Sequence, residues 1–217
     1  MSEEARLSEQ ICTIAASMFQ RGLTSGSSGN ISVRLPDGGL LVTPTGSSFG
    51  ALDPARLSRF DASGRLVSGD PPTKEMPLHS AFYETRGAKA GAVVHLHSTH
   101  SVAVSLLDDI DPDNVFRPLT AYSIMRLGKV KLLPYFRPGD PAMGEAVRGL
   151  AGRRSAVLLA HHGPVVAGKD LEAAAYAMEE LEETAKLTLL THGLRPRILP
   201  DAEVRQLVEH FGIEWDD

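Results

Sequence analysis

The sequence predicts an α/β fold built around a mixed β-sheet. Segments with helical spacing of apolar residues alternate with short β-rich runs. Two strand–turn–strand patterns, at 30–44 and 59–69, predict antiparallel hairpins, whereas helices between other strands also allow parallel pairing. The sheet should therefore be mixed. No internal repeat or low-complexity linker divides the 217 residues, so we expect one domain, residues 1–217.

The composition excludes several classes of protein. Hydrophobic residues make up 42% of the chain and charged residues 23%, which is typical of a soluble globular protein. The net charge of -5 gives no reason to expect nucleic acid or an anionic membrane as a partner. The single cysteine, Cys12, excludes an internal disulfide and disfavours a multi-cysteine zinc site. Without a signal-peptide pattern or an apolar run near twenty residues, we expect a cytoplasmic protein.

The helices are predicted by apolar residues that recur every three or four positions. The N-terminal helix should end at Gly22, and the longest helix should run from Leu171 to His192 with Gly193 behind it. Helices are also expected at 73–86 with Pro77 in the first turn, at 101–107, at 140–151 with Asp140 as cap, and at 203–210. Beyond the two hairpins, strands are expected at 91–97, 129–135 and 155–160.

The stretch GAVVHLHSTHS, residues 91–101, places three histidines within six positions. Because side chains alternate along a strand, His95 and His97 should share one face while Leu96 points to the opposite layer. Two neighbouring imidazoles favour the neutral form, and neutral imidazole binds metal ions. His100 is the third histidine of this stretch.

A further ligand can come from the strand at 155–160, which runs into His161, His162 and Gly163. A single histidine at a strand end is usually an ordinary hydrogen-bonded side chain. Two strand ends that both carry histidines, one of them as His-x-His, favour a metal site instead. Three histidines with an open coordination position are typical of a catalytic metal.

Small hydroxyl residues and glycines form two tight turns, SSGNIS at 27–32 and TPTG at 43–46. Their backbone N–H groups could hold a phosphate, although both are also ordinary hairpin sequences. Thr73, Lys74 and Glu75 stand at the start of a predicted helix, where an anion is favoured. Glu75 can be read as a solvated first-turn acid or, beside a metal, as a general base.

These motifs resemble the class II aldolase/adducin family. SSGNIS, TPTG, PTKE, VVHLHSTHSVAVS and AHHGPV follow one another in the family's order, and the resemblance covers about residues 8–192. It implies a three-layer α/β/α sandwich with a mixed, mostly antiparallel central sheet. It also implies a homotetramer with active sites between subunits.

The resemblance implies a role for each matching residue. One divalent ion per subunit, zinc in the sugar-phosphate aldolases, would be held by His95, His97 and His162, with His161 as a substituted neighbour. Glu75 would be the acid/base carboxylate. Tyr122, whose residue type alone suggests a core position, would act from a neighbouring subunit. The substrate's phosphate would be bound by Asn30, Thr45, Gly46, Thr73 and Lys74.

One departure from the aldolases indicates a narrower function. Those enzymes carry a small hydroxyl residue where this chain has Lys74. The PTKE motif, together with GSSGNISVRLPDGG, LHSTHSVAVS and YFRPGDPA, is most similar to the family's decarboxylases of 3-oxo-tetronate 4-phosphates. Such a substrate is a β-keto acid, and losing CO2 leaves an enediolate that a bound cation would stabilise. Protonation of the enediolate at C2 gives dihydroxyacetone phosphate.

Other functions on the same scaffold remain open at this point. A sugar-phosphate aldolase passes through the same enediolate and differs only in its leaving group, and a pentulose-phosphate 4-epimerase is a further alternative. The adducin head domains share the fold but act as scaffolds without the catalytic metal. The complete set of His95, His97, His162 and Glu75 disfavours the scaffold reading.

Overall fold

The computed structural model describes residues 2–215 and contains an eight-stranded sheet. Its strand order is β4-β3-β2-β1-β5-β8-β7-β6, and every neighbouring pair is antiparallel except β6 and β7. The predicted mixed, mostly antiparallel sheet is therefore confirmed. The strands are β1 (Asn30–Arg34), β2 (Leu40–Val42), β3 (Ser58–Phe60), β4 (Leu66–Ser68), β5 (Ala92–His95), β6 (Lys131–Leu133), β7 (Ala156–Leu159) and β8 (Gly163–Gly168).

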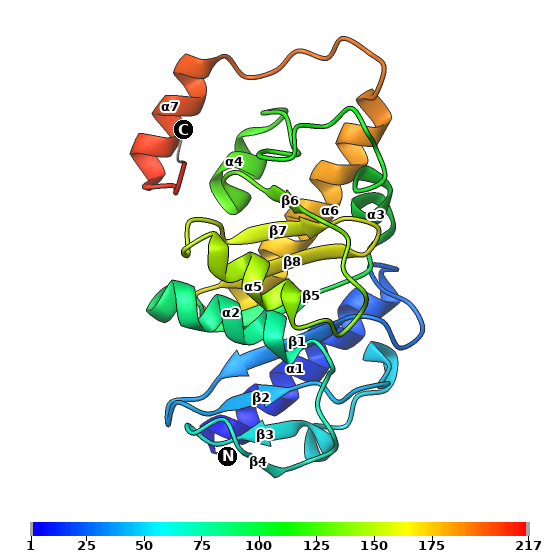
Figure 1. Cartoon of the computed structure of the whole chain (residues 1–217), viewed down its shortest axis with the longest axis vertical. Helices are drawn as coiled ribbons and strands as arrows, with labels where there is room; N and C mark the ends of the chain where they lie inside the picture. The colour runs from blue at the N-terminus through cyan, green and yellow to red at the C-terminus, as the bar shows by residue number, and fades with distance from the viewer. Residues whose placement is uncertain (1, 216–217) are drawn as a thin grey trace.

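Helices cover both faces of this sheet. In Figure 1, α2 and α5 lie in front of the strands and α1 and α6 behind them, which confirms the three-layer sandwich. The α-helices are α1 (Glu3–Gln20), α2 (Met76–Arg86), α3 (Thr99–Val104), α4 (Ala121–Leu127), α5 (Ala142–Gly149), α6 (Leu171–Thr191) and α7 (Asp201–Phe211). Short 3-10 helices occupy Phe49–Ala51, Pro54–Arg56 and Gly87–Lys89.

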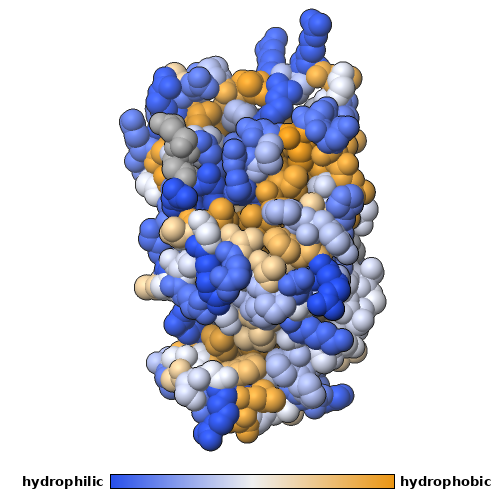
Figure 2. Space-filling view, in the orientation of Figure 1, coloured by the Kyte–Doolittle hydropathy of each residue, from blue (hydrophilic) through white to orange (hydrophobic). Residues whose placement is uncertain are grey.

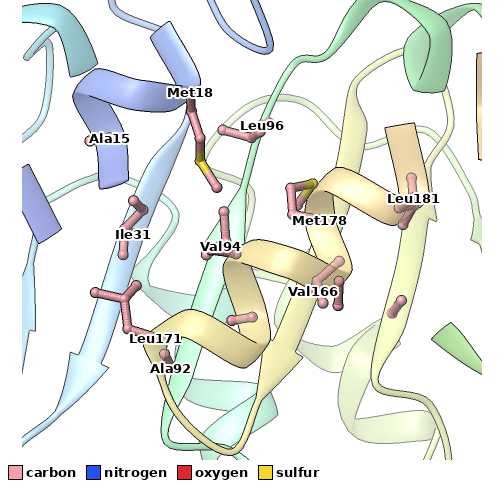
Figure 3. Close-up of a cluster of buried hydrophobic side chains, with 14 of the residues drawn as sticks. Ala15, Met18, Ile31, Ala92, Val94, Leu96, Val166, Leu171, Met178 and Leu181 are labelled. Atoms are coloured by element: carbon pink, nitrogen blue, oxygen red, sulfur yellow. The ribbon is translucent and has the colours of Figure 1, made fainter. Parts of the chain in front are cut away.

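Strand alternation divides the apolar core into two parts. Val94 and Leu96 point to the side of α1 and α6, where Figure 3 shows them between Met18 and Met178. Val93 points the other way and packs with the side chains of α2 and α5. Because His95 alternates with Val94, its imidazole lies on the α2 and α5 side. The position of the histidines follows from this alternation.

Local sequence signals set the ends of the predicted elements. The first hairpin turns at Gly38, whose φ of 85° is in the left-handed region, and Leu35 N–H donates to the Gly39 carbonyl at 2.8 Å. Helix α6 begins where the Asp170 side chain accepts from the N–H of Ala173 at 2.8 Å, and it ends before Gly193. These boundaries agree with the predicted ones.

Three features differ from the sequence expectation. Strand β8 was not predicted, because GPVVAG begins with Gly-Pro and offers too short a pattern. Helix α4 was not predicted either, although Thr120 caps it by accepting from the N–H of Ser123 at 3.1 Å. Helix α2 begins at Met76 and not at residue 73, so Pro77 is in the first turn as expected.

Apolar surface gathers on the upper part of the face shown in Figure 2, near α3 and the end of α6 in Figure 1. Several large apolar side chains of this end of the molecule are exposed, among them Leu106, Leu187, Leu190 and Leu194. Within residues 2–215, none of the helices has both the length and the apolar character required to span a membrane.

Candidate metal centre and active site

The side chains of His95, His97 and His162 converge on one point. Nε2 of His97 lies 3.1 Å from Nε2 of His95 and 3.0 Å from Nε2 of His162. Strand β5 ends at His95, but the N–H of Leu96 still donates to the Pro164 carbonyl at 3.2 Å, which keeps the chain extended. His95 and His97 therefore share a face, as the sequence predicted, and the three residues together could hold a metal ion.

The turn between β7 and β8 delivers His162 to this point. His161 has a φ of 58°, which is uncommon for a residue with a side chain, and its N–H donates to the Ser105 hydroxyl at 3.1 Å. The N–H of His162 donates to the Leu159 carbonyl at 3.2 Å. The strained turn points the side chain of His162 toward the cluster.

The protonation of the cluster suits a divalent cation. Nδ1 of His95 donates to the Pro164 carbonyl at 2.8 Å, so its Nε2 carries a free lone pair. Burial lowers the pKa of His95 to about 4, and burial together with the charge of His162 lowers the pKa of His97. Neutral imidazole nitrogens facing one another fit a shared metal ion. Because His97 is exposed while His95 and His162 are buried, one side of the site is open to solvent.

Glu75 borders the same cluster at the start of α2. Its Oε2 lies 3.3 Å from Nε2 of His95, and its Oε1 lies 3.2 Å from Nε2 of His162. Burial alone would raise the pKa of Glu75, but His95, His162 and a 2.7 Å hydrogen bond from Asn30 Nδ2 outweigh burial and lower it. Glu75 is thus a buried carboxylate next to the candidate metal site.

The predicted phosphate-binding residues approach Glu75 from two loops. The TPTG turn lies against the segment before α2, since Thr45 N–H donates to the Pro71 carbonyl at 2.9 Å and Pro44 pairs with Pro72. Thr73 is buried and accepts from the N–H of Glu75 at 3.2 Å, whereas Lys74 is exposed. Thr45 and Gly46 are exposed as well. The segment before α2 therefore offers a hydroxyl and a cation next to the carboxylate in the chain, whereas the Thr45 amide is already used by Pro71.

The Asn30 side chain faces Glu75 and His79. Its side chain is buried, and Nδ2 donates to Glu75 while Oδ1 accepts from Nε2 of His79 at 2.5 Å. The Asn30 side chain is therefore a buried link between His79 and Glu75.

His100, the third histidine of the original stretch, is not part of the cluster. Its Nδ1 lies 2.8 Å from Oε1 of Glu182 in α6. The same carboxylate accepts from the backbone N–H groups of His100 and Ser101 at 2.9 Å each. Glu182 therefore holds the N-terminus of α3, and the role of His100 is structural.

Tyr122 lies on the surface and not in the core position that its residue type suggested. It is 61% exposed on α4, and α4 packs against α6 and α7. The histidine cluster is on the other face of the sheet, where α2 and α5 pack. This placement agrees with the expectation that Tyr122 would serve a neighbouring subunit, which stays a prediction.

Sequence reasoning missed three polar residues behind the site. Ser32, His79 and Tyr83 are buried. Ser32 is hydrogen-bonded to both His79 and Tyr83, and His79 is also hydrogen-bonded to Asn30. A signal for two of them existed: residues 75, 79 and 83 follow one another at four-residue intervals and so share one face of α2. Ser32 is two residues from Asn30 on β1, so the two side chains share a face and Ser32 faces the same helix.

The chain combines a three-layer sandwich with three histidines and a carboxylate at adjacent strand and helix ends. This fold and this site together point to one known protein family. The family model named Class II Aldolase and Adducin N-terminal domain matches residues 9–189. The chain belongs to this family.

Members of this family differ in how similar they are to the chain. The chain is 52% identical to 3-oxo-tetronate 4-phosphate decarboxylase of Escherichia coli strain K12, over 94% of this chain and 96% of that protein. It is 34% identical to L-fuculose phosphate aldolase of the same organism, over 96% and 95% of the two chains. The crystal structure of YgbL from Escherichia coli superposes with a TM-score of 0.92 at 49% identity, covering 95% of this chain and 99% of the other.

Proposed function

We propose that this protein decarboxylates a 3-oxo-tetronate 4-phosphate to dihydroxyacetone phosphate and CO2. The observation that carries the proposal is the position of Glu75, whose carboxylate oxygens lie 3.2 and 3.3 Å from two members of the histidine cluster. The higher identity to a decarboxylase of this substrate class, 52% against 34% for an aldolase, favours decarboxylation.

We further propose that His95, His97 and His162 hold one divalent metal ion, zinc in the native protein. Three neutral imidazoles with an open side are the ligand set of a catalytic zinc site. When bound, the metal would supply an electrophile that stabilises negative charge developing on the substrate's ketone oxygen.

The protein's own residues would position the substrate and move the proton. The Thr45 hydroxyl and the Gly46 amide of the TPTG turn, the Thr73 hydroxyl and the Lys74 ammonium group would bind the phosphate, with Asn30 contributing its remaining N–H. As the C1–C2 bond breaks, its electron pair enters the enediolate and CO2 leaves. Glu75 would take one proton from solvent at the open side of the site and deliver it to C2, which balances the loss of CO2. We assign that proton to Oε1, which faces His162 at 3.2 Å, since Oε2 accepts from Asn30.

The active form is proposed to be a homotetramer in which Tyr122 of one subunit completes the site of the next. Tyr122 is 61% exposed, so a neighbouring subunit could contact it. Exposed apolar side chains, including Leu190 at 66% and Leu194 at 64%, suit burial between subunits. In the completed site, Tyr122 would orient the substrate end that leaves or donate a proton to it.

A sugar-phosphate aldolase is the second candidate function. The 34% identity to L-fuculose phosphate aldolase over nearly the whole chain supports it, and the same enediolate would form. A pentulose-phosphate 4-epimerase is supported less, and the intact cluster disfavours an adducin-like scaffold without catalysis.

The deciding experiment is to incubate zinc-loaded protein with a panel of phosphorylated keto acids and ketose phosphates. Release of CO2 and dihydroxyacetone phosphate from the keto acids alone would support decarboxylation, whereas aldehyde release from ketose phosphates would favour the aldolase.

Metal content measured on His95→Ala, His97→Ala and His162→Ala should fall together with activity. His192→Ala, a histidine on the surface at the end of α6, should retain both. Full metal occupancy in all three cluster variants would contradict the proposed site.

A further inference from the structure

A line of buried hydrogen bonds runs from the middle of α2 to the candidate catalytic carboxylate. The Tyr83 hydroxyl lies 2.8 Å from Oγ of Ser32, and Oγ lies 2.7 Å from Nδ1 of His79. Nε2 of His79 lies 2.5 Å from Oδ1 of Asn30, whose Nδ2 donates to Oε2 of Glu75 at 2.7 Å. All five side chains are buried, and Ser32 and His79 have no exposed surface.

The carboxylate at one end fixes the direction of every bond in the line. An ionised Glu75 can only accept, so Asn30 must present its NH2 group to Glu75 and its carbonyl oxygen to His79. His79 must then donate from Nε2, which leaves Nδ1 to accept from the Ser32 hydroxyl. The Tyr83 hydroxyl is left to donate to Ser32. Burial lowers the pKa of His79 to about 3, so the ring is neutral and one tautomer satisfies the whole line.

A purely structural role is the simplest alternative, since buried polar groups need partners. The line, however, does not end on another structural group. It ends on Oε2 of Glu75, while Oε1 of the same carboxylate faces His162 at 3.2 Å. If the side-chain amide of Asn30 were rotated by about 180°, its carbonyl oxygen would face the Glu75 carboxylate at hydrogen-bond distance and repel it. The N–H of His79 opposes that turn because it needs the Asn30 oxygen.

We propose that His79 is a positioning residue for the reaction, acting through Asn30 to hold the Glu75 carboxylate in one orientation. Ser32 donates to Nδ1 of His79 and so belongs to the same line of hydrogen bonds. The line reserves Oε2 for Asn30 and leaves Oε1 for proton exchange with substrate. This inference rests on the proposed role of Glu75 in proton transfer.

The kinetic test compares a non-polar and a polar replacement at position 79. His79→Leu removes the N–H that faces Asn30, and we expect kcat to fall about 10-fold or more while KM changes less than about 3-fold. His79→Gln can place an amide N–H near the lost one and should recover at least half of that loss on a logarithmic scale. Zinc content should stay at the parent level in both variants, because the metal ligands are untouched.

A pair of serines separates positioning from loss of packing. Ser32 and Ser58 are both fully buried, and the Ser58 hydroxyl donates to the Asp70 carbonyl at 2.7 Å, two strands away from β1. Ser32→Ala should lower kcat about 3-fold to 10-fold, whereas Ser58→Ala should lower thermal stability with kcat unchanged. Equal kcat values in folded, metal-loaded His79→Leu and parent protein would overturn the proposal, as would equal effects of the two serine variants on kcat.

A measurement without turnover tests the same line independently of the proposed function. In 15N spectra of the imidazole groups, with His79 assigned from the His79→Gln spectrum, the ring should be neutral with its proton on Nε2 between pH 5 and pH 8. Ser32→Ala should keep the proton on Nε2, because the Asn30 carbonyl still faces that nitrogen. A parent protein with the proton on Nδ1 would overturn the inference. If instead the parent failed to decarboxylate any keto acid, the proposed function would fail, and the spectra would still decide the direction of the hydrogen bonds.

Discussion

Gly163 packs directly against the carbonyl oxygen of Leu96. A Cβ at position 163 would lie 2.2 Å from that oxygen, and the glycine has a φ of 155°. Leu96 stands between His95 and His97, and Gly163 follows His162. The absence of a side chain at this one residue therefore allows the two histidine-bearing segments to approach within ligand distance.

Gly163→Ala is expected to separate these segments. The added methyl group cannot be accommodated against backbone, so we expect a loss of about 1–3 kcal/mol or more in unfolding free energy and a clear loss of bound zinc. Gly149→Ala is the matched control, because a Cβ there meets no atom within 4 Å. Differential scanning calorimetry and metal analysis on both variants check the prediction, which is refuted if Gly163→Ala binds zinc as the parent does.

Glu75→Gln should separate metal binding from catalysis. The amide is nearly isosteric with the carboxylate but cannot exchange a proton at C2, so kcat should fall by about 100-fold or more. Zinc content should be retained, since the three histidines remain. Single-turnover rates and metal analysis provide the test, and a variant with near-parental kcat would exclude Glu75 as the proton donor.

Lys74→Ala should weaken substrate binding with little effect on the metal. Loss of a charge-assisted hydrogen bond to phosphate is expected to raise KM about 10-fold or more. Lys89→Ala is a suitable control, because that exposed lysine pairs with Glu214 beyond the far end of α2. Steady-state kinetics with phosphorylated and non-phosphorylated substrates checks this. Equal turnover of both substrates by the parent would remove the basis for a phosphate site.

Mixing two inactive variants tests whether sites are shared between subunits. Tyr122 is proposed to act on the cluster of a neighbouring chain, so Tyr122→Phe and Glu75→Gln each disable a different half of a shared site. Mixed oligomers should recover partial activity, because some interfaces regain both native residues. Activity is measured after dissociation and reassembly, with subunit mixing verified by mass spectrometry. Verified mixed oligomers without recovery would count against the shared site.

The metal-free protein should lose stability as the pH falls below neutrality. In the folded state, burial lowers the pKa of His95 to about 4 and that of His79 to about 3 from an ordinary value of 6.5. The unfolded chain therefore binds more protons across this window, so stability is full above pH 6.5 and declines toward pH 4 and below. The lowered pKa of Glu75 adds a further loss below its ordinary value of 4.5.

Thermal melts of the metal-free protein between pH 4 and pH 7.5 check this direction. His79→Gln lacks one of the two buried imidazoles, so its stability should depend less steeply on pH than that of the parent. A parent protein whose melting temperature is constant over this range would contradict the assignment of neutral, buried histidines.

Much of the fold was readable from local patterns. The apolar spacing and flanking residues of α1 and α6, and the glycine turn of the first hairpin, act over a few residues. They gave the end of α1 to within two residues, both ends of α6 and the turn of the hairpin. Strand β8 and helix α4 were missed because their patterns are short, and tertiary packing, which is not local, stabilises them. The order of strands in the sheet could not be derived from local signals at all.

The sequence by itself determined which chemical groups stand at strand and helix ends: the His-x-His after a buried strand, His162 beside a glycine, and Glu75 before α2. Strand alternation even placed His95 and His97 on one face. Only the tertiary structure decided that His162 joins them while His100 turns to Glu182, and that His79 backs Asn30 and Glu75. The physical reason is that side-chain direction follows from local backbone geometry, whereas the partners across a sheet depend on how distant segments pack.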